Sequence, residues 1–568
     1  MPTPLRLLSK VSLFARTVSN LKIQQILYQV WYRISFRHDT DSIARKTDSV
    51  QIRNLKSTAD FINYAVIEAQ EYGAQNSFCF LNETVRFRDG IDWCCPEKDR
   101  LWRYNLHYFH YLPLTGASDI DTEIQLIKDW IQNNPVGSPD AWDPFPISLR
   151  LVNWIKFLTS ASLSDEDKAY ISQSMVIQFR WLMKHLEYHL FGNHLFKNGK
   201  ALVVGGLFFK GPEAERWLGT GVQIIDSQIR EQVLADGGHF ERSPMYHSMI
   251  LEDCLDMLNF INAQINPGLD GLALKLASAA ERMVGFLKMM CHPDGMISLF
   301  NDAALGIEAE PDQLFDYYER VTGKKVQVGT DKALSLSDTG YYILAPDEQN
   351  KMIVDCGHVG PAYQPGHCHC DTLSFELSVA GQRVIVDSGC FQYVDGEIRQ
   401  YNRGNKGHNT ITVDDENQSE IWGAHRCARK ARPLEVECRQ EETRLYFKGG
   451  HDGYRRLKGR PVHYREINFK EHTWKVLDRI EGHGWHKVES RLHLHPSLEV
   501  ESLGRELYIF HGDKRLLKIQ HTGNADIGIE KGWYCPEFGK KYACDVIVYK
   551  VDQAELPFEC GWKMELDV

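Results

Sequence analysis

The chain has 568 residues, of which 43% are hydrophobic and 25% are charged, and its formal net charge is −11. This composition is ordinary for a folded globular protein, and the length exceeds what one hydrophobic core holds, so we expect at least two domains. The negative balance, without a dense block of basic and aromatic residues, argues against a nucleic-acid partner.

The N-terminal stretch and the cysteines give information on the cellular compartment in which the protein is located. Residues 1–37 alternate short apolar runs with Arg and Lys, and they lack the long apolar core and cleavage site of a secretory signal. We interpret this stretch as an amphipathic surface helix, and we find no segment long and apolar enough to span a bilayer. The 14 cysteines have no regular disulfide spacing, which favours a reducing compartment.

The first part of the chain is predicted to be helical. Residues 1–95 indicate a helical start followed by an irregular segment, and residues 96–330 repeat apolar side chains at helical spacing, as in Leu251, Leu255 and Leu258. The expected helices include Ile120–Asn133, Pro146–Ser160, Asp165–His189, Asn198–Phe209, Glu213–Leu234, Ser248–Ala263 and Leu272–Cys291. So many successive helices with short connections predict helix pairs wound into an arc or toroid.

The pattern changes near residue 331. From there to residue 568, short runs rich in Val, Ile, Thr and Tyr are separated by Gly, Asp and Asn. Strands in such numbers without intervening helices predict an antiparallel β-sandwich. We place the domain boundary within Lys324–Ser337, which makes the chain an α+β multidomain protein.

Polar side chains are concentrated early in the predicted sandwich. The run Gly366-His367-Cys368-His369-Cys370-Asp371, if it is a strand, places two imidazoles and a carboxylate on one face. Further polar residues follow at the ends of later predicted strands: Asp387, Tyr401 and His408. Because imidazoles and carboxylates are metal ligands and proton carriers, we favour a functional site over a solvated strand.

The helical part carries polar clusters of its own. Gly192-Asn193-His194 precedes a predicted helix, the run Asp236–His247 forms a polar loop that caps the next one, and Asn301-Asp302 lies in another loop. Each cluster alone is typical of a helix cap or a turn. Their combination is less easily explained by capping.

Together these motifs resemble the heparinase II/III-like polysaccharide lyases. The resemblance rests on Gly192-Asn193-His194-Leu195, the Asp236–His247 run and Gly366-His367-x-His369-x-Asp371, in this order, and covers about residue 100 to beyond 430. It implies an incomplete (α/α) toroid followed by an antiparallel β-sandwich, in agreement with the patterns above. It also implies β-elimination at a uronic acid residue of an acidic polysaccharide.

The resemblance assigns roles to five residues. Elimination requires that the sugar carboxylate be neutralised, that a base take the C5 proton and that an acid protonate the leaving oxygen. Asn193 matches the carboxylate-binding residue, with His194 beside it, and Tyr246 matches the general acid. The base is either His367 or Tyr401, and the sequence leaves this choice open.

Other side chains near these motifs are expected to bind substrate: His239, Glu241, Arg242, Arg399 and Arg403. Arg399 and Arg403 would also help Tyr401 to act as a base. A tyrosine with an ordinary pKa of about 10 needs nearby positive charge to lose its proton near neutrality.

The resemblance further implies a structural zinc ion held by His369, Asp387 and His408. Two histidines and one carboxylate suit tetrahedral zinc with a water or substrate in the fourth place. The alternative is a hydrogen-bonded His-Asp-His cluster without metal. Cys368 and Cys370 would point to the opposite face of the strand, into the core.

Two other functions stay open. A glycoside hydrolase on the same toroid would use a carboxylate pair such as Asp236 with Glu241 or Glu252. A polysaccharide-binding or biosynthetic accessory protein would need no catalytic residue. The sequence also leaves open which polymer is bound, whether cleavage is endo or exo, and whether the chain forms a homodimer. The compartment is open as well, because the family resemblance favours the periplasm whereas the cysteines favour the cytoplasm.

Overall fold

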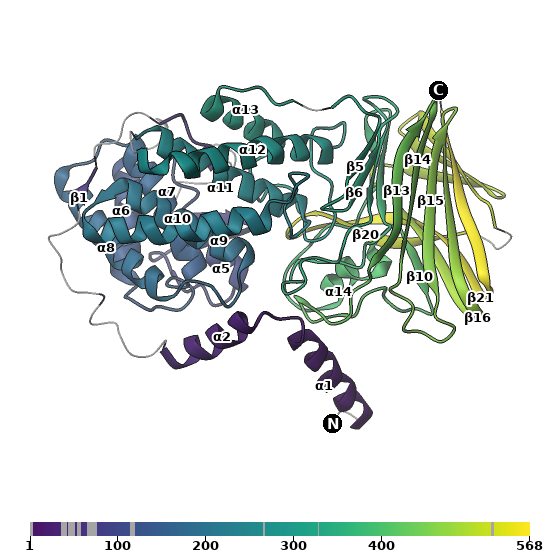
Figure 1. Ribbon diagram of the computed structural model, residues 1–568, viewed down its shortest axis with the longest axis horizontal. Helices are drawn as coiled ribbons and strands as arrows, with labels where there is room; N and C mark the ends of the chain where they lie inside the picture. Colours follow the sequence, from purple (N-terminus) through teal and green to yellow (C-terminus); the bar gives the residue numbers. More distant parts are fainter. Residues whose placement is uncertain are drawn as a thin grey trace.

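A helical half and a sheet half lie side by side in the computed structural model (Figure 1). The structure describes residues 4–35, 43, 51–53, 58–64, 76–113, 120–264, 267–327, 329–523 and 527–567. This order confirms the predicted fold class of a helical region followed by antiparallel sheets. The last helix of the first half ends at Thr322, and the first strand of the second half begins at Ala333.

Helix starts in the first half are fixed by local side chains. Ser164 caps α8 (Asp165–Lys184) by accepting a hydrogen bond from the Asp167 N–H, and Ser243 caps α11 (Pro244–Asn262) by accepting one from the Tyr246 N–H. The helices are α5 (Arg100–Tyr108), α6 (Ile120–Asn133), α7 (Pro144–Ser160), α8 (Asp165–Lys184), α9 (Gly192–Phe208), α10 (Pro212–Gln232), α11 (Pro244–Asn262), α12 (Asp270–Met290) and α13 (Pro311–Thr322). Helix α11 is buried from Pro244 to Ile261, all but its last residue, so it forms the centre of this half.

Two sheets form the second half. The smaller has the antiparallel order β5-β6-β7-β8-β9, and the larger has the order β13-β14-β15-β16-β21-β19-β18-β17, with β10 paired to β16 and β20 to β21. Their bounds are β5 (Ala333–Leu336), β6 (Tyr341–Leu344), β7 (Lys351–Asp355), β8 (Phe375–Val379), β9 (Gln382–Ile385), β10 (Ile411–Val413), β13 (Pro433–Glu441), β14 (Arg444–His451), β15 (Val462–Lys470), β16 (Thr473–His493), β17 (Glu499–Leu503), β18 (Glu506–His511), β19 (Lys514–His521), β20 (Ile527–Glu537) and β21 (Lys540–Leu566). A buried apolar cluster fills the space between the sheets.

Short elements complete the fold. A helix, α14 (Glu397–Arg403), carries Tyr401 and precedes β10. The remaining strands form two-stranded pairs: β1 (Gln51–Ile52) with β4 (Phe209–Lys210), β2 (Ser77–Phe80) with β3 (Glu83–Arg86), and β11 (Ile421–Trp422) with β12 (Arg426–Cys427).

Two local predictions were wrong. Helix α9 begins at Gly192, so Asn193 and His194 lie inside its first turn rather than before it. Residues 366–374 are a loop, and the strand begins only at Phe375. The loop forms because the backbone N–H groups of His369 and Cys370 donate to the Asn301 side chain and the Arg403 carbonyl rather than to a neighbouring strand.

The two halves are joined by apolar and polar contacts. A small buried cluster packs Phe286 and Met290 of α12 against Tyr341 and Ile353 of the smaller sheet. Polar contacts surround Glu376 on β8, which accepts hydrogen bonds from His292 at 2.6 Å and from the Leu299 N–H at 3.1 Å. Both donors belong to the helical half, so this buried carboxylate fixes the position of one half on the other.

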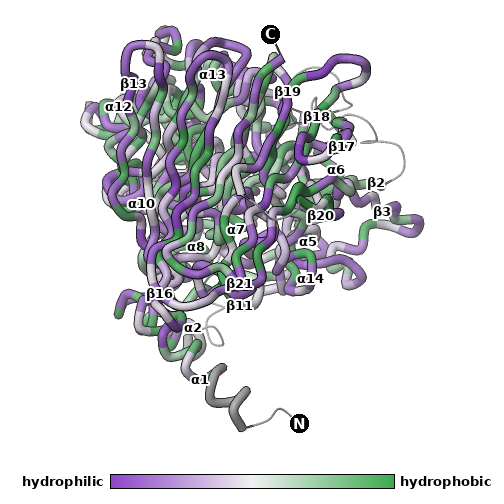
Figure 2. Tube along the Cα trace, turned by 90° about the vertical axis from the view of Figure 1, so that its right-hand side faces the viewer, coloured by the Kyte–Doolittle hydropathy of each residue, from purple (hydrophilic) through white to green (hydrophobic). Residues whose placement is uncertain are grey.

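Two N-terminal helices lie beneath both halves (Figures 1 and 2). Helix α1 (Pro4–Val18) contacts the sheet half through the ion pair of Arg16 with Glu420 at 3.1 Å. Helix α2 (Ile23–Ser35) contacts the helical half, where Tyr28 stacks on Tyr188. Among the described residues, we find no helix with the length and hydropathy needed to cross a membrane.

We expect Glu376→Ala to lower the free energy of unfolding by about 3–5 kcal/mol, because it leaves Nε2 of His292 and two backbone N–H groups buried without their acceptor and removes an ion pair of Arg383. Denaturant titration measures this change. Glu348→Ala, at an exposed turn of the same sheet, is the matched control and should change the value by less than about 0.5 kcal/mol. Equal effects of the two substitutions would contradict the role given to Glu376.

Candidate active site

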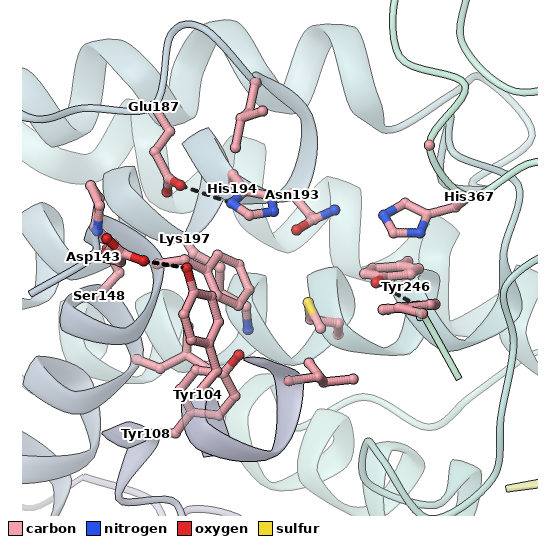
Figure 3. A pocket seen from close by; sticks show the side chains of 18 of the residues that line it. Tyr104, Tyr108, Asp143, Ser148, Glu187, Asn193, His194, Lys197, Tyr246 and His367 are labelled. Carbon is pink, nitrogen blue, oxygen red and sulfur yellow. Dashed lines mark hydrogen bonds and ion pairs between the residues drawn. The ribbon is translucent and has the colours of Figure 1, made fainter. Parts of the chain in front are cut away.

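A cleft with a volume of about 980 Å³ lies between the two halves. Helices α5, α7, α9 and α11 line one side, residues 363–367, 393–394 and 425–426 line the other, and α1 and α2 contribute a third wall. Four of the five predicted catalytic residues line it: Asn193, His194, Tyr246 and His367 (Figure 3). The fold therefore brings together residues that lie up to 174 positions apart in the chain.

Asn193 is fixed at the N-terminus of α9 by a carboxylate. Its Nδ2 donates to both oxygens of Glu241, at 3.0 and 3.2 Å, and its backbone N–H donates to the same side chain at 3.1 Å. The preceding Gly192 has φ +56°, and a Cβ there would lie 2.3 Å from Gln364 and 2.4 Å from Glu241. Glycine is thus required for this close packing.

His194 lies beside Asn193 and is paired with an acid. Its Nδ1 contacts Glu187 Oε1 at 2.9 Å, and its ring packs on Phe145. Burial alone would lower the pKa of His194, but the Glu187 carboxylate outweighs burial and raises this pKa above its ordinary value. The imidazole is therefore biased toward its cationic form, which suits an anionic ligand.

Tyr246 and His367 pack against each other in the wall of the cleft (Figure 3). Tyr246 lies in the first turn of α11, and the centroids of the two rings are 4.1 Å apart. The Tyr246 hydroxyl is 2.9 Å from the hydroxyl of Tyr393. Burial raises the pKa of Tyr246 well above its usual range, so the hydroxyl keeps its proton and is equipped to donate it.

Asp302 orients His367 and His369 together. Its Oδ2 contacts His367 Nδ1 at 3.0 Å, its Oδ1 contacts His369 Nε2 at 2.8 Å, and Arg399 binds both oxygens. Burial alone would raise the pKa of Asp302, but Arg399 lowers it well below its usual range. An ionised Asp302 accepts the Nδ1 proton of His367, which leaves Nε2 of a neutral His367 able to accept a proton.

Tyr401 is not among the residues that line the cleft. Its hydroxyl accepts a hydrogen bond from the Trp533 N–H at 3.2 Å and lies 3.2 Å from Nε2 of His493. Burial raises the pKa of Tyr401, and neither Arg399 nor Arg403 offsets this rise. The structure thus does not bring Tyr401 to the other four predicted catalytic residues.

The three arginines predicted to bind substrate have structural partners instead, and none lines the cleft. Arg242 donates to the carbonyls of Thr339, Phe240 and Asp338, and Arg403 donates to those of Cys368, Gly423 and Arg426. Arg399 binds Asp302. Their guanidinium groups satisfy buried carbonyls and a buried carboxylate, a use of arginine that the sequence does not distinguish from substrate binding.

His239 and Glu241 also lie behind the cleft wall rather than in it. His239 Nε2 contacts Gln232 Oε1 at 2.9 Å, and Gln232 donates to the Gly192 carbonyl at 2.8 Å. Glu241 holds Asn193, as described above. Both residues therefore position the start of α9, and neither is among the residues that line the cleft, although Glu241 Oε2 lies 3.8 Å from Nε2 of His367.

His369, Asp387 and His408 form a buried group with ligand atoms all within 4.8 Å of one another. Asp387 Oδ2 is 2.7 Å from His408 Nδ1, while His369 Nδ1 and His408 Nε2 have no hydrogen-bond partner among the described residues. Burial lowers the pKa of His369 to about 3, which keeps the ring neutral. Buried, unpartnered imidazole nitrogens beside a carboxylate fit a metal ion, so this group could hold one.

The carboxylates considered for hydrolysis have other partners. Asp236 accepts from the N–H and hydroxyl of Thr339, both at 2.7 Å, and Glu241 holds Asn193. Glu252 lines the cleft but accepts hydrogen bonds from Tyr64 and Lys156. The pair Asp236 and Glu241 is thus absent from the cleft lining, which weakens the hydrolase alternative.

Lysines at the cleft wall are neutralised. Lys197 and Lys200 contact Asp253 at 2.8 and 2.7 Å, and Lys156 and Lys200 both contact Asp256 at 2.6 Å. Burial alone would raise the pKa of Asp256, but these two lysines lower it to about 2, so the carboxylate stays ionised. These lysines therefore add little net positive charge to the cleft.

Sequence reasoning missed four side chains that shape the site: Glu187, Asp302, Tyr393 and His425. The polar Asn301-Asp302 turn follows a predicted helix, and this position was the feature of the sequence that could have indicated a role for Asp302 in the site. Tyr393 and His425 lie in irregular segments, where no periodicity marks a residue that faces a cleft.

Comparisons with known proteins agree with this fold. The sequence model for the heparinase II/III N-terminus matches residues 7–321, and that for the heparinase II/III-like C-terminal region matches residues 329–563. A heparin-sulfate lyase of Bacteroides stercoris is 25% identical over 389 residues, 59% of this chain and 57% of that protein, and that of Bacteroides thetaiotaomicron is 25% identical over 394 residues, 60% and 56%. The chain thus spans somewhat more than half the length of these relatives. The crystal structure of heparinase III has a TM-score of 0.68 at 18% identity, covering 92% of this chain and 88% of that one.

We expect Gly192→Ala to displace Glu241 and to lower the free energy of unfolding by about 1–2 kcal/mol or more, because a Cβ at positive φ adds strain to the clash. Gly219→Ala in α10, where a Cβ meets nothing within 4 Å, is the matched control and should be neutral or stabilising. Denaturant titration compares the two. A Gly192→Ala chain as stable as the control would show that this close packing is not required.

Proposed function

The chain belongs to the heparinase II/III-like family, and on that premise we propose that it is a polysaccharide lyase that cleaves a uronic-acid-containing polysaccharide by β-elimination. The main support for the proposal is the contact between Tyr246 of the helical half and His367 of the sheet half, whose ring centroids are 4.1 Å apart in the cleft. A proton donor and a proton acceptor so close together suit a reaction that removes and delivers a proton on one side of a sugar.

The carboxylate of the uronic acid would bind beside Asn193 and His194. The Glu187 carboxylate raises the pKa of His194, so a cationic imidazole would oppose the sugar carboxylate and lower the cost of removing the C5 proton. Asn193, held by Glu241, would donate from its amide as negative charge grows on the carboxylate in the transition state.

His367 would be the base. With Nδ1 bonded to Asp302, its Nε2 would accept the C5 proton, and the electron pair of the C5–H bond would form the C4–C5 double bond. The C4–O bond would break, and Tyr246 would give its proton to the departing oxygen. The raised pKa of Tyr246 keeps this proton in place until a more basic sugar oxygen forms. We do not assign the base role to Tyr401, because its hydroxyl lies outside the cleft lining.

Zinc is the metal that we propose for His369, Asp387 and His408, because two imidazoles and one carboxylate are ligands that it accepts in tetrahedral sites. The ion would brace the loop that carries His367. It would not take part in the proton transfers.

The charges of the cleft favour a polymer with carboxylates and few sulfates. The lining holds five Lys or Arg and five Asp or Glu, and three of the lysines are paired with carboxylates. A densely sulfated chain would need an excess of basic side chains to replace its counterions. We therefore propose an unsulfated or sparsely sulfated uronate polymer as the substrate.

We expect uronate polymers such as heparosan to yield products that absorb ultraviolet light through the new C4–C5 double bond. Tyr246→Phe and His367→Ala should each lower kcat at least ~100-fold, the usual contribution of a general acid or base. Tyr401→Phe is the control and should stay within a few-fold of wild type. New reducing ends without absorbance would support a hydrolase instead, and no reaction on any uronate polymer would favour a binding protein.

Elemental analysis should find about one zinc ion per purified chain, and a chelator that removes it should lower the Tm. His408→Ala should abolish the bound zinc. His521→Ala, which removes another buried histidine with an unpartnered nitrogen, is the matched control and should retain the metal. A wild-type chain without metal after purification in zinc-containing buffer would contradict this assignment.

A further inference from the structure

Helix α2 presents its apolar side to solvent. Its apolar residues recur at helical spacing, in one stripe: Ile23, Ile26, Leu27, Val30 and Trp31. Four of these side chains are between 53% and 74% exposed, and Ile26 is 39% exposed. In a surface helix of a globular protein such a stripe ordinarily faces the core, so α2 has the reverse orientation.

The side of α2 that packs on the protein is polar and aromatic. Gln25 is buried and donates to the His189 carbonyl at 3.5 Å. Tyr28 stacks on Tyr188, and Tyr32 packs edge-on against His189. These contacts fix how the helix is rotated, so the apolar stripe cannot turn inward without losing them.

Helix α1 extends the exposed apolar surface. Val11 and Phe14, one helical turn apart, are 60% and 58% exposed. Figures 1 and 2 show α1 and α2 at one end of the protein, with α1 extending farther from its body than α2. An exposed surface of this kind marks a place where another surface docks.

The charge of this segment indicates what docks there. Residues 1–38 contain six Lys or Arg residues and no Asp or Glu, in a chain whose net charge is −11. Arg16 and Lys22 form ion pairs with Glu420 and Glu231. Four more basic residues flank them in the sequence: Arg6, Lys10, Arg33 and Arg37. A basic segment with exposed Trp, Phe and Leu matches the composition of helices that lie in the interface of an anionic lipid membrane.

We propose that the outer face of α1 and α2 docks on an anionic lipid surface, with the stripe of Leu27 and Trp31 inserted among the lipids and the net positive charge of residues 1–38 attracted to the headgroups. A second copy of the chain fits less well, because a symmetric contact would bring two segments of the same positive charge together. This docking is independent of the lyase chemistry.

The docking would hold the cleft next to the lipid. Thr17 and Leu21 of the α1 region and Gln25, Gln29 and Tyr32 of α2 line the cleft from inside. One helical layer, about 10–12 Å thick, would therefore separate the cleft from the lipid headgroups. Polymer that lies at the lipid surface would therefore be the first to enter the cleft.

Co-sedimentation of the full-length chain with vesicles tests the proposal. We expect binding to vesicles of phosphatidylcholine mixed with phosphatidylglycerol, much weaker binding to phosphatidylcholine alone, and a loss of binding as salt is raised. The variant Leu27→Ser/Trp31→Ser should lower the partition coefficient at least ~10-fold, because two large apolar side chains no longer insert.

The matched control is Leu503→Ser/Trp485→Ser, which removes the same two residue types from exposed positions in the sheet half, where they are 70% and 63% exposed. It should bind vesicles like wild type. Circular dichroism and thermal unfolding show whether each variant is folded, and sedimentation velocity without lipid reports self-association. Failure of the wild-type chain to bind anionic vesicles, equal binding by both double variants, or a wild-type oligomer that only Leu27→Ser/Trp31→Ser dissociates would overturn the proposal.

Discussion

The site depends on the contacts of one buried carboxylate, that of Asp302. A fully buried carboxylate is costly unless it is paired and hydrogen-bonded, and here Arg399 balances its charge while His367 and His369 use its remaining acceptor capacity. Asp302 comes from the loops that follow the long helices, whereas its three partners all come from the sheet half. Satisfying this one group therefore fixes the two halves against each other and places His367 opposite Tyr246.

The same contact links the chemistry of the cleft to the group that could hold a metal. His369 gives one ring nitrogen to Asp302 and leaves the other beside Asp387 and His408. His367 lies two residues earlier in the same loop, whose backbone is held by Asn301 and Arg403 rather than by a strand. A metal ion in this group would thus stiffen the loop that carries the base while remaining outside the reaction.

The sequence predicted the order of helices and strands because buried side chains recur with one spacing in a helix and another in a strand. Both spacings can be recognised within a short stretch of sequence. Specific motifs in the sequence also predicted that Asn193, His194, Tyr246 and His367 share one cleft, and all four line it, while their catalytic roles belong to the proposal. Prediction from the sequence failed where a local pattern has two meanings. The His-Cys-His-Cys-Asp alternation resembles a strand, yet distant partners hold it as a loop. Arg242, Arg399 and Arg403 resemble a binding surface for a polyanion, yet they satisfy buried acceptors, and only the tertiary structure shows this.

The central claim is that groups from both halves act on one sugar in one cleft, and a crystal structure of the Tyr246→Phe variant with a uronate oligosaccharide tests it most directly. The account predicts a sugar carboxylate beside Asn193 and His194, with C5 of the same sugar about 3–3.5 Å from His367 Nε2. An oligosaccharide bound elsewhere, or one whose C5 faces Tyr401 instead of His367, would contradict it.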